Sequence, residues 1–303
     1  MDRRSPEPHT PVLYQQVLSA LDPQPGCRMI DGTLGAGGHA EGILERSAPS
    51  GQLLGLDRDP VALPLALQRL ERFGARLQLR QGSFRDLSAH AAAVGWQAVD
   101  GILLDLGLSS MQLADPRRGF SFRAEAPLDM RFDPGQELEA AELVNRLPEP
   151  ELASLIARYG EDPRARRIAH AIVAARPLQT TTQLAEVVAR AVRSRGSRTH
   201  PATRTFQALR IAVNEELTAL EEALPQAVEL LKPGGRLVVI AFHSLEDRLV
   251  KRFCRDASFS TEERPARLRR ITRKPVRPEP EELERNPRAR SARLRVAEKI
   301  GPA

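Results

Sequence analysis

Hydrophobic and polar positions in the first third of the chain follow two alternating patterns. Short apolar runs of the kind that form buried strands are separated by stretches with apolar residues at helical spacing, such as Leu63, Leu67 and Leu70 in residues 60–73. The predicted strands cover residues 28–31, 51–57, 76–81 and 99–105. Strands that alternate with helices indicate a parallel sheet with helices on its faces, so we predict the α/β class.

The alternation stops after Asp105 and returns later in the chain. Residues 138–195 carry a helical pattern throughout and are rich in Ala, Leu, Arg and Glu. We therefore predict an inserted all-helical domain over 113–201, within a Rossmann-like domain made of 1–112 and 202–303. The resumed pattern predicts a helix, a strand, a second helix and a last strand, over residues 205–231, 236–242, 245–255 and 292–298.

A glycine-rich turn follows the first predicted strand. Residues 35–40, Gly-Ala-Gly-Gly-His-Ala, match the pattern G-x-G-x-x-G/A between a strand and a helix. Glycines there let a ligand approach the backbone, and the helix N-terminus favours an anionic group. Asp57, twenty residues after Gly37 at the end of the next strand, can accept hydrogen bonds from both ribose hydroxyls. Together these features predict a nucleoside cofactor, either a nicotinamide dinucleotide or S-adenosylmethionine.

Three later features favour S-adenosylmethionine. Asp105 ends the fourth strand, where it could hold the adenine or orient a substrate, and Phe84 follows the third strand, where it could cover the adenine ring. The turn at 232–235, Lys-Pro-Gly-Gly, leads into a late strand as it often does in class I methyltransferases. We find no sequence pattern of a hydride-transfer site, so we predict a methyltransferase.

The chain is basic, with a formal net charge of +6 and a pI of about 10. Residues 264–295 hold twelve Arg or Lys residues against four Glu, and five prolines interrupt them. We expect an extended basic arm there, with a merely solvated, partly disordered tail as the alternative. A second basic stretch runs over 193–204. Two such stretches beside a nucleoside site favour RNA phosphates as the partner.

The sequence gives little evidence of a membrane span, a signal peptide, a disulfide framework or a zinc site. No run approaches the ~18 apolar residues of a membrane span, and the first residues lack the apolar core of a signal peptide. Cys27 and Cys254 are too few and too far apart for a disulfide framework or a zinc site. We therefore expect a cytoplasmic protein that uses no metal site and does not bind membranes.

Seven blocks of sequence occur in an order typical of one family. They are HTPVL (9–13), DGTLGAGGH (31–39), DRDP (57–60), DGILLDLGLSS (100–110), RGFSF (118–122), HPATRTFQALRI (200–211) and FHSLEDR (242–248). With these blocks, from about His9 to Glu298, the chain resembles the bacterial methyltransferases that act on cytosine N4 in 16S ribosomal RNA.

The resemblance implies N4-methylation of one cytidine near the decoding centre of the small ribosomal subunit. S-adenosylmethionine is then the methyl donor, and 16S rRNA within that subunit is the partner. The cofactor contacts implied by the family are Gly37, Gly38, His39, Asp57, Phe84, Asp105 and Gln112, all present here. Leu34, Ala36 and Met111 depart from the family pattern without disturbing these residues. The helical insertion leaves room for a homodimer.

The N4 amine of cytosine is a poor nucleophile, because its lone pair is delocalised into the ring. Catalysis must hold that nitrogen in line with the methyl group and accept hydrogen bonds from its protons. Asp105 is the first candidate for this role and Ser109 the second, while an Asp105 that serves only the cofactor is the alternative. The candidate contacts to RNA are Arg198, His200, Arg204, Asn214 and His243.

Two other functions stay open from the residues alone. One is a methyltransferase of DNA or of a small amine, and the family blocks argue against it. The other is a non-catalytic RNA-binding or assembly factor that kept the fold. The presence of Gly37, Gly38, Asp57 and Asp105 argues against this second function, because a purely structural protein needs none of them together.

Overall fold

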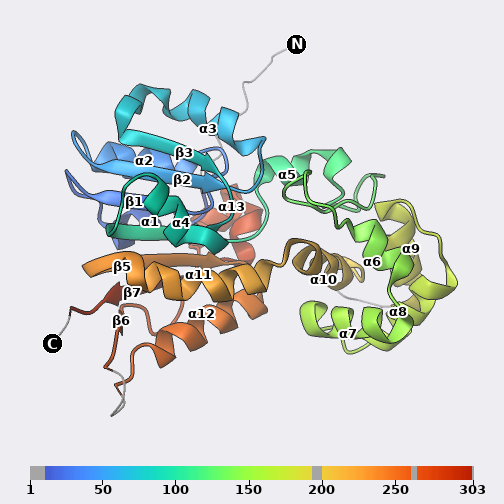
Figure 1. The fold of residues 1–303 in the computed structure, drawn as a ribbon. Coiled ribbons are helices and arrows are strands. Elements are labelled where there is room, and N and C mark those ends of the chain that lie inside the picture. Colours follow the sequence, from blue (N-terminus) through green and yellow to red (C-terminus); the bar gives the residue numbers. More distant parts are fainter. Residues whose placement is uncertain (1–10, 193–199, 261–264, 302–303) are drawn as a thin grey trace. The chain divides into compact units, whose positions relative to one another are not determined.

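The computed structural model describes residues 11–192, 200–260 and 265–301, which form two compact units (Figure 1). The sheet unit combines Met1–Gly107 with Leu217–Ala303, and the helical unit is Leu108–Glu216. Each unit has hydrophobic core residues of its own. The helical unit is inserted into the sequence of the sheet unit, and it extends beyond the predicted 113–201 at both ends.

A seven-stranded sheet organises the sheet unit, with the strand order β3-β2-β1-β4-β5-β7-β6. The strands are β1 (Arg28–Asp31), β2 (Gln52–Asp57), β3 (Leu77–Gln81), β4 (Val99–Asp105), β5 (Leu231–Ala241), β6 (Leu268–Arg270) and β7 (Arg293–Lys299). Among these described strands, β7 alone runs opposite to the others. The chain passes from β3 back across the sheet to β4, which makes the carboxyl ends of β1 and β4 the expected ligand crevice.

Helices cover both faces of this sheet (Figure 1). On one face they are α1 (Tyr14–Leu21), α2 (Gly38–Arg46) and α3 (Ala62–Leu70), and on the other α4 (Leu87–Ala93), α11 (Glu216–Leu230) and α12 (Ser244–Asp256). Successive strand residues alternate between the two faces, so Met29 packs with the first set of helices and Ile30 with the second. The central strands are therefore apolar on both sides, as a doubly covered parallel sheet requires.

The described part of the helical unit is built from six helices. They are α5 (Ser110–Ala114), α6 (Ala140–Arg146), α7 (Glu149–Gly160), α8 (Ala165–Ala174), α9 (Thr181–Val192) and α10 (Thr203–Asn214). The helix α7 packs against α8 and α10, and α8 packs against α9. Gly160 permits a close approach between α7 and α10, because a Cβ there would lie 2.7 Å from the Arg204 carbonyl oxygen.

The basic segment 264–295 is folded, which corrects the expectation of an extended arm. Its described residues form β6, α13 (Pro280–Arg285), the 3-10 turn η4 (Pro287–Ser291) and the start of β7. Its apolar residues are few and widely spaced, so charge dominates the sequence pattern. Leu268, Ala289 and Leu294 nevertheless lie buried in the cores of the sheet unit.

The structure confirms the α/β class, the mostly parallel sheet with helices on both faces and the inserted helical segment. It also confirms the last strand expected over 292–298. The strand β5 begins earlier than predicted, at Leu231, and residues 232–235 form a bulge opposite β4. No helix within the described ranges is both long enough and apolar enough to cross a membrane.

Candidate functional site

Three strands of the sheet end in an aspartate at the same edge. The strand β1 ends at Asp31, β2 at Asp57 and β4 at Asp105, and parallel pairing brings these ends to one side of the sheet. Because β1 lies between β2 and β4, Asp31 is the middle one of the three. Open α/β sheets bind their ligands at this carboxyl edge, so the three acids mark the candidate site.

The glycine-rich turn joins β1 to α2 at the same edge. Gly35 and Gly37 have φ angles of 53° and 80°, a left-handed conformation that glycine adopts without strain. Gly37 precedes the first residue of α2, Gly38. The amide of Gly35 donates to Asp57 Oδ2 at 2.7 Å, and the amide of Asp59 donates to Oδ1 at 2.8 Å. Asp57 thus fixes the turn, and each of its oxygens can accept a second hydrogen bond.

Thr33 connects Asp31 with Asp105. Its hydroxyl accepts from the Asp105 amide at 2.6 Å and donates to Asp31 Oδ1 at 3.4 Å, while its amide donates to the same oxygen at 3.1 Å. The other oxygen of Asp31, Oδ2, and the Oδ1 atom of Asp105 are buried without a hydrogen-bond partner among the described residues. The structure therefore fixes these two carboxyl groups and leaves one buried oxygen of each without a hydrogen-bond partner in the part of the chain that it describes.

Burial raises the pKa of all three carboxyls. The pKa of Asp31 rises to about 7 and that of Asp57 to about 6, even though backbone amides bonded to each act in the opposite direction. The pKa of Asp105 is raised well above its usual range, first by burial and then by the charges of Asp31 and Glu246. A positively charged ligand would favour the ionised carboxylates, so this edge is suited to bind a cation.

His39, in the first turn of α2, is buried and faces Asp105. Its ring stacks on Tyr14 with centroids 6.0 Å apart, and its Nε2 atom lies 3.7 Å from Asp105 Oδ2, beyond hydrogen-bond distance. Burial lowers the pKa of His39 to about 3, although the Val12 backbone acts in the opposite direction. The imidazole is therefore neutral at physiological pH and does not neutralise the carboxylate of Asp105.

Phe84 opens the 3-10 turn η2 (Phe84–Asp86) after β3 and lies beside the glycine turn. A Cβ at Gly32 would approach the Phe84 Cβ to 3.1 Å and the Leu104 Cδ2 to 2.7 Å. Phe84 is half-buried and packs on the core beneath the sheet edge. Gly32 therefore allows this aromatic ring to lie next to the site.

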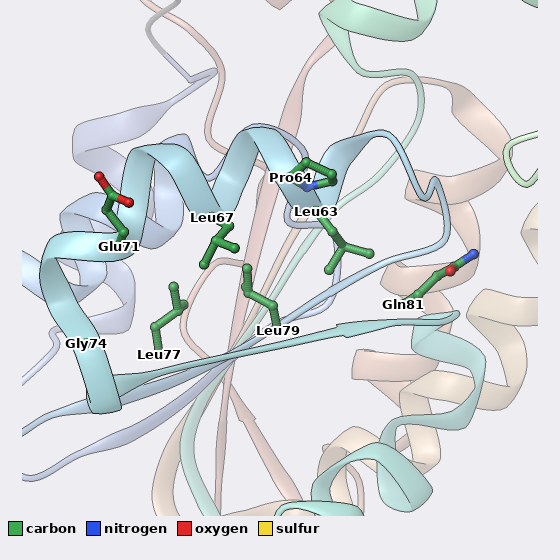
Figure 2. Close-up of a pocket in the computed structure, with 8 residues that line it drawn as sticks. All are labelled: Leu63, Pro64, Leu67, Glu71, Gly74, Leu77, Leu79 and Gln81. Atoms are coloured by element: carbon green, nitrogen blue, oxygen red, sulfur yellow. The ribbon is translucent and has the colours of Figure 1, made fainter.

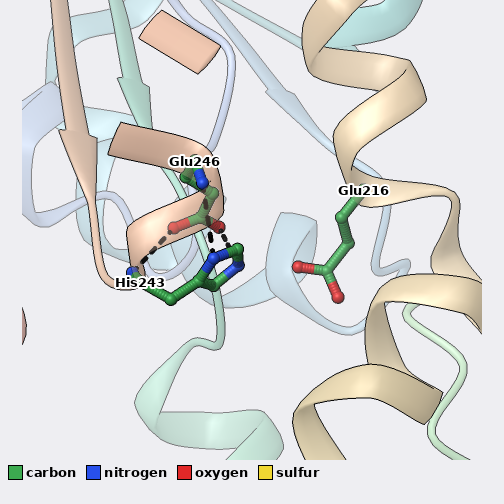
Figure 3. A group of neighbouring side chains, drawn as sticks. All are labelled: Glu216, His243 and Glu246. Carbon is green, nitrogen blue, oxygen red and sulfur yellow. Dashed lines mark hydrogen bonds and ion pairs between the residues drawn. The ribbon is translucent and has the colours of Figure 1, made fainter. Parts of the chain in front are cut away.

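His243, the N-cap of α12, and Glu246, in the first turn of that helix, form a capping box (Figure 3). Glu246 Oε2 accepts from the amides of Phe242 and His243 at 2.8 and 3.2 Å, and His243 Nδ1 accepts from the Glu246 amide at 3.4 Å. The His243 Nε2 atom lies 3.1 Å from Glu246 Oε1. The contacts that the structure gives His243 are those of a helix cap, and its role toward RNA stays a prediction.

Ser109 and Gln112 belong to the helical unit, where they form the capping box of α5. Ser109 Oγ accepts from the Gln112 amide at 3.1 Å, and Gln112 Oε1 accepts from the Ser109 amide at 3.0 Å. These bonds give both side chains a structural role at the start of the helix. The catalytic role of Ser109 and the cofactor contact of Gln112 stay predictions.

Two of the RNA candidates near the start of α10 are exposed. The Nδ1 atom of His200 accepts from the Ala202 amide at 3.2 Å, and the Arg204 guanidinium donates to the Glu161 carbonyl at 2.8 Å. Both side chains remain accessible to a phosphate. Arg198 lies outside the described residues.

Asn214, the last residue of α10, is fully buried. Its side chain accepts from the Phe132 amide at 2.7 Å and donates to the carbonyls of Met130 and Arg210 at 2.7 and 3.0 Å. These contacts correct the expectation that Asn214 faces RNA, because its amide group already serves the backbone of the helical unit. Helical spacing from Arg210 could not reveal that the loop at 130–132 covers this residue.

Three residues near the carboxyl edge, Asp31, Thr33 and Glu246, were not predicted as site residues from the sequence. Asp31 carries the same signal as Asp57 and Asp105, a carboxylate at the end of an apolar strand, and could have been found. Glu246 follows position 243 by three residues, which is the spacing of a capping box. No sequence pattern reveals the bond from the Asp105 amide to Thr33, because 72 residues separate the two.

An apolar groove of about 580 Å³ runs between α3 and the edge strand β3 (Figure 2). Leu63 and Leu67 line it from the helix, and Leu77 and Leu79 line it from the strand. Its lining also includes Gln81, the residue paired with Asp57 in the sheet. None of the three aspartates lines this groove.

Comparison with known proteins identifies the family. A model of the MraW methylase family matches residues 6–300. The chain belongs to this family. The Ribosomal RNA small subunit methyltransferase H of Thermomicrobium roseum is 57% identical over 305 residues, covering 96% of this chain and 94% of that protein. The protein of the same name from Dehalococcoides mccartyi is 53% identical over 304 residues, covering 97% of this chain and 87% of the relative.

Membership of the MraW methylase family confirms the identification made from the seven sequence blocks. The family match spans both units, so the helical unit belongs to the family as much as the sheet does. Together with the strand order and the antiparallel β7, it identifies the sheet unit as a class I methyltransferase fold.

Proposed function

We propose that this MraW-family chain transfers a methyl group from S-adenosylmethionine to N4 of one cytidine in 16S ribosomal RNA, near the decoding centre of the small subunit. The observation that carries the proposal is the carboxyl edge of the sheet, where Asp31, Asp57 and Asp105 surround the glycine turn. The names of the relatives at 57% and 53% identity, small subunit rRNA methyltransferases, supply the class of substrate.

The residues at this edge fit S-adenosylmethionine, which combines a ribose, an adenine, an amino acid and a positively charged sulfur. Asp57 would accept the ribose hydroxyls, because its carboxylate lies at the turn and carboxylate oxygens can each accept more than one hydrogen bond. The backbone at Gly37 and Gly38 would approach the cofactor closely, and Phe84 would cover the adenine. His39 would contribute through its backbone, because its ring is buried against Tyr14. Gln112 is the remaining residue that we propose as a contact to the cofactor.

When bound, S-adenosylmethionine supplies a methyl group on a sulfonium, which is already a good leaving group. The chain must therefore hold the cytosine amine in line and receive its proton. We assign this to Asp105, whose Oδ1 has no hydrogen-bond partner in the part of the chain that the structure describes. Its backbone is fixed by Thr33, so the carboxylate is positioned before substrate arrives. Ser109 is the second candidate.

The helical unit is our proposed substrate-recognition domain. It carries the exposed His200 and Arg204 and the segment that contains Arg198, all of which can contact RNA phosphates. From the substrate class we propose a cytoplasmic protein whose partner is 16S rRNA within the small ribosomal subunit. We propose a homodimer as the assembly to test, by light scattering at several protein concentrations.

The proposal is tested by methyl transfer from labelled S-adenosylmethionine to small ribosomal subunits that lack their native modification, followed by nucleoside analysis. We expect label in N4-methylcytidine and its loss in Asp105→Ala, with cofactor binding measured separately by calorimetry. Label in another nucleoside would keep the enzyme class and overturn the target atom. Cofactor binding without any label on RNA would favour an assembly factor instead.

A further inference from the structure

We propose that the exposed face of α12, together with Phe259, binds the backbone and one base of the substrate RNA outside the reaction centre. This inference rests on the function proposed above and specifies which surface of the sheet unit holds the RNA. The residues involved lie within 248–259, and none of them was predicted as a site residue from the sequence.

The cations of α12 lie on one face of the helix. Arg248, Lys251, Arg252 and Arg255 follow at intervals of three, one and three residues, the spacing that places side chains in one stripe. All four are exposed. We call these four residues the α12 stripe. With thirteen residues, α12 is about 20 Å long, so the stripe can follow several phosphates.

The acids at the start of the same helix are turned away from solvent. Glu246 is buried in the capping box, and Asp247 is buried in ion pairs with Arg293 and Arg295 of β7. Near the end of the helix, Asp256 is exposed and binds Arg255 at 2.8 Å. Arg255, the last residue of the α12 stripe, therefore has its charge offset by an acid of the same helix.

Neighbouring basic residues on β6 and just before it behave differently. Arg267 forms an ion pair with Glu229, and Arg269 forms one with Glu298. The first pair links the residue before β6 to α11, and the second links β6 to β7. No such pair involves Lys251 or Arg252 within the described ranges, so these two cations are the centre of the proposed binding surface.

An exposed aromatic residue extends the stripe. Phe259 follows the end of α12 by three residues, and 56% of its surface is exposed. The guanidinium of Arg270 lies 6.0 Å from the centre of its ring. Aromatic residues make up only 4% of this chain. An exposed ring beside cations is the arrangement by which proteins stack unpaired bases while binding the phosphates.

The stripe begins at the edge of the sheet that carries the candidate site. The helix α12 starts three residues after Ala241, the end of β5, and β5 pairs with β4 so that Ile240 lies opposite Asp105. The helix then packs along β5 and β7. An RNA strand bound on the stripe would therefore lead toward the carboxyl edge where Asp105 lies.

Charge and exposure favour RNA over a membrane as the occupant of this surface. The apolar residues of α12 that would enter a bilayer, such as Val250 and Cys254, are buried in the core of the sheet unit. The exposed face offers cations and one aromatic ring, which complement phosphates and a base.

The test compares binding to unmethylated small ribosomal subunits and to isolated 16S rRNA, at several monovalent-salt concentrations and fixed Mg²⁺. The variants are Lys251→Ala/Arg252→Ala and Phe259→Ala. The control is Arg72→Ala/Arg80→Ala, which removes two exposed cations at the β3 end of the same sheet. Calorimetry with S-adenosylmethionine checks that each variant keeps the cofactor site.

We expect the stripe variant to bind both probes on the order of tenfold more weakly at moderate salt. The slope of log affinity against log salt should become shallower by about 1.4, the value for two lost contacts to single-stranded phosphates. Phe259→Ala should weaken binding about tenfold with an unchanged salt slope, because stacking involves no counterions. The control should bind like the unaltered protein.

Stripe and Phe259 variants that bind like the control would overturn the inference and leave the proposed function intact. A loss confined to intact subunits, absent with isolated 16S rRNA, would also overturn it and assign the surface to a ribosomal protein. An unaltered protein that binds cofactor but neither binds nor methylates RNA would overturn the proposed function, and this inference with it.

Discussion

The carboxyl edge of the sheet unit and the core of the helical unit both bury polar side chains, but they treat them differently. In the helical unit, the buried Asn214 makes three hydrogen bonds to backbone atoms, and the half-buried Asn145 makes three more to Ala141 and Leu178. At the sheet edge, Asp31 and Asp105 each keep one buried oxygen without a partner among the described residues.

The difference separates groups that stabilise the fold from groups held for a ligand. A buried amide with all its bonds made fixes one arrangement of the backbone around it. A buried carboxyl with an unsatisfied oxygen costs stability, and such groups persist where function requires them. Substitutions in the two regions should therefore have opposite effects on stability and on activity.

The largest effect is expected for Asp105→Asn. Methyl transfer in a single turnover should fall by about 10²-fold or more, because the amide cannot take the proton of the amine. The free energy of unfolding in denaturant should stay constant or rise, because a neutral group replaces a buried carboxyl. Cofactor affinity is measured alongside: a rise in Kd that accounts for the whole loss of rate would restrict Asp105 to holding the cofactor.

For Asn214→Ala in the helical unit we expect the opposite result, a loss of stability without a loss of cofactor binding. The free energy of unfolding should fall by about 3 kcal/mol, because the backbone groups of Met130 and Phe132 lose their buried partner. Affinity for S-adenosylmethionine should not change. Arg166→Ala on the exposed part of α8 is the control, expected within about 0.5 kcal/mol of the unaltered protein. Weaker RNA binding with unchanged stability would instead make Asn214 an RNA contact.

A more gradual effect, spread over about three pH units, should appear in the pH dependence of stability. The pKa of Asp31 is about 7 in the folded protein against 3.8 as its ordinary value, so the folded state holds the proton more tightly than the unfolded state. Stability is therefore lost as the pH rises between these two values, by up to about 1.4 kcal/mol per pH unit. Asp31→Asn should remove this contribution from the denaturation profile.

The same titration gives a second readout for Asp31. Because a cationic ligand favours the ionised carboxylate, cofactor affinity should rise as the pH increases through about 7. Asp31→Asn should flatten that rise. Identical pH profiles for the variant and the unaltered protein, in both stability and affinity, would show that Asp31 does not titrate in this range.

The smallest effect is expected for Ser109→Ala at the start of α5. Losing the acceptor for the Gln112 amide should cost about 1 kcal/mol of stability, and the rate of methyl transfer should change less than tenfold. Ser109→Asn is the matched variant, because asparagine also caps helices. A fall in rate beyond about 10²-fold in both variants would make Ser109 a catalytic residue.

Much of the fold could be predicted because strong local signals agree with the tertiary structure. The strand ends at Asp57 and Asp105 and the turn at Gly35–Gly38 combine apolar runs, glycines and acids within short stretches. The family blocks add the substrate. Packing of the basic segment could not be predicted, since the burial of Leu268 and Leu294 depends on partners far away in sequence.

The site was predicted in part for the same reason. Glycines and strand-end acids carry local signals, whereas the link from Thr33 to Asp105 and the covering of Asn214 by residues 130–132 depend on long-range contacts. His39 illustrates the limit well. Its motif predicts a residue beside the glycine turn, but only the fold shows that its ring is buried and neutral.

The position of β7 between β5 and β6 has a consequence for how the protein is made. During synthesis, β5 leaves the ribosome before β7, so its apolar residues from Leu237 to Ile240 form an open strand edge until residues 293–299 follow. Such an edge pairs readily with other chains. A premature stop codon before Arg293 should therefore yield an aggregating chain rather than a smaller active enzyme, which makes the last strand the closing step of biogenesis.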